Sequence, residues 1–154
     1  LMEGKKLDLK IGWKRKVEMD NNKITYMEMI QGIINRMAGN SFSLKGWAVT
    51  LVAGIFALAS KNTDKMYFLV TYVPILVFWF LDAYYLLQER LYRSLYNKVR
   101  IMKEEDVDFD MNTNLPDIKS EKNVYYICLF SKTELGFYLP LALMVAVIII
   151  LTNL

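Results

Sequence analysis

The sequence contains no histidine and a single cysteine, Cys128. Without histidine the common zinc-ligand sets and the most frequent catalytic acid–base residue are missing, and a lone cysteine excludes an intrachain disulfide. No glycine-rich phosphate loop and no nucleophile–base pattern is present either. We therefore expect no enzymatic activity, no cofactor and no metal site, and we interpret Cys128 as a small buried hydrophobe.

Charged residues are also scarce, at 23% of the chain, and they cluster outside three apolar stretches. A soluble domain spreads its charges so that every element can show a wet face, whereas segregation favours a bilayer as the solvent for part of the chain. The net charge of +3 suits contact with an anionic membrane leaflet. It is too small to indicate direct nucleic-acid binding.

The three apolar stretches cover residues 44–60, 66–87 and 135–151. Each is close to the minimum of roughly 17 residues that a helix needs to cross the hydrocarbon of a bilayer. The sequence therefore predicts an all-α integral membrane bundle of three transmembrane helices. A buried helical hairpin of a soluble protein is the alternative for the first two stretches, and it would need a large polar partner to cover them.

The orientation follows from the distribution of lysine and arginine, because these residues concentrate in cytoplasmic loops. Residues 1–45 and 88–134 are rich in both, whereas the turn between the first two stretches holds only Lys61 and Lys65. The N-terminus and loop 88–134 are thus predicted in the cytoplasm and the C-terminus outside. The expected location is a bacterial inner membrane, crossed several times.

Two further helical patterns flank the predicted spans. Residues 1–40 form a cytoplasmic arm with an amphipathic helix over residues 23–37, predicted to lie at the membrane surface or to pack on a neighbour. Asn40 or Ser41 is the expected cap of the next helix. The second span continues without a stop signal as a cytoplasmic helix to about Lys103.

The projecting part of that helix has two faces. An apolar stripe needs a partner, and a second copy of the same helix is the simplest one; a basic face lies beside it. The stripe comprises Leu91, Leu95, Val99 and Met102, and the basic face comprises Arg90, Arg93 and Arg100.

Residues 104–123 form an acidic stretch, and residues 124–134 an apolar segment expected at the membrane interface. Alternate aspartates from Asp106 to Asp110 resemble the start of an EF-hand loop. However, Met111 stands where such a loop needs glycine, and Asp117 stands where it needs a long bidentate glutamate. We interpret the stretch as a solvated linker.

Lys45 and Asp82 are the most informative charged residues. Counted from the outer turn, they lie at nearly the same depth of an antiparallel pair of helices, at the inner membrane face. A carboxylate near a membrane boundary is costly unless it is wet or paired. Three interpretations stay open: a charged gate at the mouth of a pore, an ion pair that locks the hairpin, or simple snorkelling to water.

Small residues, aromatics and prolines mark the spans. The first span carries a small face, predicted to allow close helix packing within or between chains, that comprises Gly46, Thr50, Gly54, Ala53 and Ala57. Aromatic residues near the span ends, among them Trp47, Tyr84 and Tyr138, predict an aromatic belt. Pro74 predicts a kink in the second span, and Pro140 is expected in the first turn of the third.

The strings in residues 40–60 and 78–96, NSFSLKGWAVTLVAGIFALAS and FWFLDAYYLLQERLYRSLY, belong to a layout that resembles the SLATT-type membrane effectors of antiphage systems. The resemblance covers residues 23–103; the third span and the absence of a recognisable sensing domain depart from it. It implies an oligomeric helical effector that permeabilises the inner membrane when a nucleotide-signalling or sensing partner triggers it.

Three functional hypotheses follow. The first is a pore-forming or membrane-disrupting homo-oligomer in bacterial defence. The second is a non-conducting membrane anchor or scaffold that recruits a cytoplasmic protein through residues 88–130. The third is a subunit of a transporter or secretion assembly, which would purify as a fixed hetero-complex.

Overall fold

The computed structural model describes residues 2–59, 69–119 and 123–151, and over these residues the chain is all-helical and contains no strand. The helices are α1 (Met2–Ala59), α3 (Tyr72–Ile101), the 3-10 turn η1 (Glu104–Asp106), α4 (Tyr125–Leu129) and α5 (Lys132–Leu151). Ser60, which ends the first predicted span, and residues 66–68, which begin the second, lie outside the described residues.

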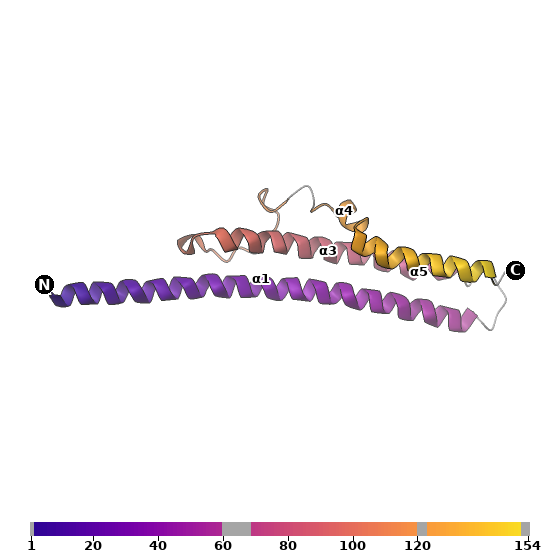
Figure 1. The fold of residues 1–154 in the computed structure, drawn as a ribbon, viewed down its shortest axis with the longest axis horizontal. Helices are drawn as coiled ribbons and strands as arrows, with labels where there is room; N and C mark the ends of the chain where they lie inside the picture. The colour runs from indigo at the N-terminus through magenta and orange to yellow at the C-terminus, as the bar shows by residue number, and fades with distance from the viewer. Residues whose placement is uncertain (1, 60–68, 120–122, 152–154) are drawn as a thin grey trace.

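The long helices run side by side along one axis (Figure 1). α1 and α3 are antiparallel and make the most extensive contact between elements, while α5 packs on α3. The N-terminal part of α1 extends beyond the end of α3, and α5 ends near the opposite end of the molecule (Figure 1). The result is an elongated bundle rather than a layered domain.

α1 is one unbroken helix, so the predicted boundary at Asn40 or Ser41 is wrong. The segment over residues 23–37 is not a separate helix lying at a surface; it continues directly into the first apolar stretch. The short polar residues cause no break because they bond along the helix or across to α3. The Ser43 hydroxyl donates to the Gly39 carbonyl at 3.0 Å, and the Ser41 hydroxyl donates to Asp82 instead of capping a helix.

The second long helix is interrupted close to Pro74, the residue at which a kink was predicted. Leu69 and Val70 are helical, Thr71 lies in a turn that keeps helical backbone angles, and α3 begins at Tyr72. Pro74 has no N–H to donate to the Val70 carbonyl, so the hydrogen-bond ladder loses one rung there. α3 ends at Ile101, two residues before the predicted end.

Two apolar cores hold the bundle together. The first core joins the middle of α1 to the C-terminal half of α3, and the second core joins the C-terminal half of α1 to the beginning of α3 and to α5. The first core comprises Tyr26, Ile30, Ile34, Leu91, Leu95, Val99 and Ile118. The second core comprises Ala48, Val52, Ile75, Tyr138, Leu141 and Val145.

The expected second copy on the α3 stripe is not needed, because the chain covers this stripe itself. Leu91, Leu95 and Val99 are buried in the first core against Tyr26 and Ile30 of α1. The expectation was wrong because it considered the apolar stripe of α3 without the apolar stripe of α1. The unbroken α1 places its own apolar stripe opposite that of α3, and each stripe covers the other.

Residues 104–119 fold back on the first core as irregular chain with one 3-10 turn. Ile118 is buried there, and Val107, Met111 and Leu115 pack around it. The segment is therefore a loop, as predicted, but one that is attached by apolar contacts. Lys23 of α1 adds a hydrogen bond from its ammonium to the Met102 carbonyl at 2.7 Å.

The last two helices meet at Ser131. Its hydroxyl accepts a hydrogen bond from the Glu134 backbone N–H at 3.4 Å, which is the geometry of a helix N-cap. α5 therefore begins at Lys132, three residues earlier than predicted. For this reason Pro140 lies inside α5 and not in its first turn.

Two of the described helices are long and apolar enough to cross a membrane: α1 within Asn21–Leu58, and α5 over Lys132–Leu151. α3, which contains most of the second predicted span, is not one of them. Membrane association is thus indicated by two helices, and the full three-span arrangement is taken up below as a proposal.

Candidate functional site: a buried charge layer

A layer of charged side chains separates the two cores. Lys45 comes from α1, Asp82 from α3 and Glu134 from the first turn of α5. Asp82 and Glu134 are completely buried, and the Lys45 side chain is 17% exposed. Three helices thus contribute one charged residue each to a single point of the bundle.

Asp82 is the most completely bonded member of this charge layer. One carboxylate oxygen accepts from the Ser41 hydroxyl. The other accepts from the Lys45 ammonium and, at 3.0 Å, from the Tyr138 hydroxyl. Donors on three sides are what an ionised carboxylate needs when it leaves water.

Lys45 connects all the acidic groups of the layer. Its ammonium donates to Asp82, to the Ser41 hydroxyl at 3.1 Å and to Glu134 Oε1 at 3.3 Å. It also lies 5.8 Å from the centre of the Phe137 ring and 5.9 Å from that of Tyr138. A lysine has three N–H donors, and all of them are engaged.

Glu134 is bonded less completely. Among the described residues, its Oε1 atom accepts a single hydrogen bond, from Lys45 at 3.3 Å. Its Oε2 atom is buried and has no hydrogen-bond partner in the part of the chain that the structure describes. The two buried carboxyl groups of the layer therefore stand in different environments, although they share one cation.

Aromatic side chains close the layer on the side of α4. The Trp79 ring stacks on Tyr138 at 6.3 Å between centres and meets Phe130 edge-on at 6.0 Å. The Trp79 indole N–H donates to the Leu129 carbonyl at 2.9 Å, which ties α4 to α3. Tyr138 is thus buried beside Asp82, and its predicted place in an aromatic belt is wrong.

Cys128 is buried on α4, as the sequence indicated. Burial raises the pKa of its thiol, the nearby Arg90 guanidinium opposes this shift, and Glu134 adds to it. The thiol is therefore a poor nucleophile at neutral pH, because the thiolate is the reactive form.

In the part of the chain that the structure describes, the predicted small face of α1 points outward. Gly46, Thr50 and Gly54 are exposed, and a methyl group added at either glycine would meet nothing within 4 Å. Ala53 and Ala57 are exposed as well. Inside the bundle α1 uses Ala48 and Val52.

The predicted basic face of α3 is divided. Arg93 is exposed and pairs with Glu89 at 2.8 Å one turn earlier, and Arg100 is exposed. Arg90 instead interacts with Cys128 of α4. Only the first two therefore share an outward surface.

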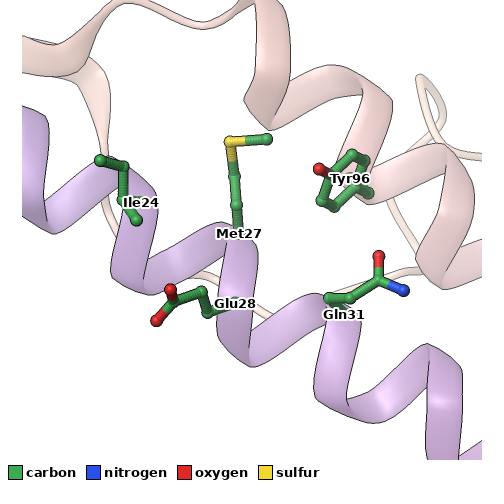
Figure 2. Close-up of a pocket in the computed structure, with 5 residues that line it drawn as sticks. All are labelled: Ile24, Met27, Glu28, Gln31 and Tyr96. Carbon is green, nitrogen blue, oxygen red and sulfur yellow. The ribbon is translucent and has the colours of Figure 1, made fainter.

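A second feature lies between α1 and α3 beside the first core. Figure 2 shows this groove, with Met27 of α1 pointing toward α3 and Tyr96 of α3 facing it. Glu28 and Gln31 line it on the α1 side, together with Ile24. It combines an apolar floor with a polar rim, which is a common composition of protein contact sites.

Sequence reasoning identified Lys45 and Asp82 and missed Glu134, Ser41 and Tyr138. One signal could have found Glu134. Ser131 and Glu134 have the spacing of a capping box, which places the glutamate in the first turn of a helix at the inner end of the last apolar stretch. No comparable signal marks Tyr138, whose role depends on how α5 is rotated.

The arrangement is suited to holding three helices together, and within the part of the chain that the structure describes it offers no nucleophile–base pair. Among the described residues, no group of three acidic, histidine or cysteine side chains could hold a metal ion. No family model, curated protein or solved structure matches this chain.

Proposed function

We propose that this chain is an integral membrane protein with three spans, its N-terminus and residues 88–134 in the cytoplasm and its C-terminus outside. The support is the surface around the second core. In the most apolar windows of α1 and α5 only 17% and 22% of residues are buried, so most of these apolar side chains face outward. The core helix of a soluble protein would have most of its apolar side chains buried.

α3 serves as the remaining span in this proposal. Val73 and Val77 of its first half face outward, at 57% and 50% exposed. Its one acidic residue at this level, Asp82, is turned inward and paired with Lys45. The cost of placing a carboxylate in a membrane helix is thereby largely offset.

Exposed aromatic side chains support the position of the inner interface. Phe42 and Trp47 of α1 are 80% and 59% exposed, and they flank Lys45 in sequence. Tyr84 of α3, Tyr126 of α4 and Phe130, just after α4, are exposed too. Aromatic residues favour the boundary between headgroups and hydrocarbon, so the charge layer would lie at this boundary on the cytoplasmic side.

We further propose that the protein assembles as a homo-oligomer that permeabilises the bacterial inner membrane, in the manner of an antiphage defence effector. The observation that carries this proposal is the outward small face of α1. Its glycines at 46 and 54 allow the backbones of two copies to approach closely, which stabilises helix association in lipid.

A dye experiment tests the proposal. Expression of the chain in bacteria that carry a potential-sensitive dye should depolarise the cells, and Gly54→Leu should reduce depolarisation because it blocks close approach. Leu143→Phe is the matched control, since it enlarges a side chain that is already 57% exposed but lies on α5, outside the small face. Depolarisation that never occurs, or that is equal in both variants, contradicts the proposal.

The groove of Figure 2 favours a second function, a non-conducting scaffold for a cytoplasmic protein or a signal-bearing partner. In that case Glu28→Lys should abolish partner capture, because it reverses the charge at the rim of the groove. Asp82→Asn should leave capture unchanged. The reverse pattern contradicts the scaffold function.

A further inference from the structure

The buried charge layer contains one more acidic group than it has cations. Lys45 balances the charge of Asp82, and an ionised Glu134 would leave one uncompensated negative charge in the bundle. Buried charges without a partner are avoided in proteins, which neutralise such groups by binding a proton or a counter-ion.

The hydrogen bonds distinguish the two carboxyl groups. Asp82 accepts from Ser41, Lys45 and Tyr138, so both its oxygens act as acceptors. Glu134 Oε2 receives nothing from the described residues, and the three N–H donors of Lys45 are already in use. An O–H at Glu134 would turn this unsatisfied acceptor into a donor, and the Asp82 carboxylate is its neighbour across the shared Lys45 ammonium.

Among the described residues, the remaining groups around Glu134 do not supply another cation. Asp82 of α3 is an acceptor, and Tyr138 of α5 is a neutral hydroxyl that donates to it. Cys128 of α4 is a buried thiol. Arg90 of α3 is a further cation in this region, and its guanidinium interacts with the Cys128 thiol. Lys45 of α1 is shared already.

We infer that Asp82 and Glu134 share one proton, carried on Glu134 Oε2 at neutral pH, and that the charge layer is a proton-binding site. The partly exposed Lys45 side chain marks the route by which this proton exchanges with water. Loss of the proton leaves a net negative charge between α5 and the α1–α3 pair, which loosens α5. The inference goes beyond the proposed function and does not require a pore.

Infrared spectroscopy of the full chain in lipid tests the site directly. The wild type should show a C=O band of a protonated, buried carboxyl group at neutral pH, and the band should disappear as the pH is raised. Glu134→Gln should remove the band. Glu105→Gln is the matched control, because the Glu105 side chain is 70% exposed and lies outside the charge layer.

A second measurement follows the fold. The melting temperature of the wild type should fall as the pH rises through the loss of the band, because proton loss charges the layer. Glu134→Gln imitates the protonated state, so its melting temperature should stay flat over the same range.

Several outcomes would overturn the inference. These are a folded wild type without the band, a band that survives in Glu134→Gln but is lost in Asp82→Asn, or a band that depends on sodium rather than on pH. Failure of Glu134→Gln to fold also counts against it, because glutamine has the shape and charge of the protonated acid. Loss of membrane permeability alone would not affect it.

Discussion

Lys45 and Asp82 lie 37 residues apart in the chain and form an ion pair at the junction of the two apolar cores. The pair joins α1 to α3 at one depth and, through the 3.3 Å contact of Lys45 with Glu134, it also joins α5. A substitution at this point therefore changes the contacts of all three long helices.

Removal of the cation should destabilise the bundle strongly. Lys45→Met leaves the buried Asp82 carboxylate without a counter-charge and Glu134 without its hydrogen-bond donor, and the loss of one member of a buried pair typically costs about 3–5 kcal/mol. We expect a loss of this size in the free energy of unfolding, measured by denaturation in detergent.

The exposed pair of Lys103 and Glu105, 3.8 Å apart, provides the control for that measurement. Lys103→Met should change the free energy of unfolding little, because exposed pairs are solvated and screened. An equal effect of both variants would mean that the buried layer contributes no special stability.

The first core should stabilise the single chain rather than an oligomer. Ile30→Ala opens space in a fully buried position, and such truncations cost about 2–5 kcal/mol. The unfolding midpoint should therefore fall. Light scattering in detergent should give the same oligomeric mass as the wild type.

Ile101→Ala is the matched control, since Ile101 is 81% exposed. It should leave both the midpoint and the mass unchanged. Dissociation of an oligomer by Ile30→Ala, with no change in the midpoint, would show that the stripe is a contact between copies.

The Cys128 thiol should react slowly with maleimide in the folded protein. Burial raises its pKa, so the fraction of thiolate at neutral pH is smaller than for an ordinary cysteine, and the labelling rate should keep increasing at pH values above the usual titration range. Unfolding in denaturant should restore normal labelling.

A cysteine at an exposed position of the same helix gives the comparison. Tyr126 is 70% exposed, so Tyr126→Cys in a Cys128→Ser background should label rapidly. Slow labelling there as well would place the surface of α4 against lipid or a partner, and rapid labelling of native Cys128 would contradict its burial.

The proposed topology can be checked in intact cells. Lys103→Cys in a Cys128→Ser background places an exposed thiol at the end of α3 that is predicted in the cytoplasm. A maleimide that cannot cross membranes should label it only after the inner membrane is permeabilised. Labelling in cells with an intact inner membrane would reverse the orientation.

Much of the helical content could be predicted from apolar runs and periodicity. The pattern around Leu91, Leu95 and Val99 predicted a helix with one apolar face, and the structure has that helix. The partner of the face could not be predicted, because periodicity within one segment says nothing about which other segment lies opposite. The same limit explains why the sequence left open whether the small face at Gly46 and Gly54 packs within the chain or between copies; in the structure both glycines are exposed.

Helix ends were predicted less well. The polar residues at Asn40 and Ser41 are typical of a cap, yet α1 passes through them because Ser41 finds its partner on α3. Conversely, α5 begins earlier than its apolar run because Ser131 caps it. Capping preferences act within one turn, and a tertiary hydrogen bond can override them.

The sequence by itself determined that this chain is helical, that its charges apart from Lys45 and Asp82 lie outside its apolar stretches, and that these two residues stand at matching depths. These properties depend on composition and on distance along the chain, which a helix converts directly into length. Only the tertiary structure decided that Glu134 and Tyr138 join them. That outcome depends on the rotation of α5 about its own axis, which is set by packing against α1 and α3 and is not encoded in any local pattern.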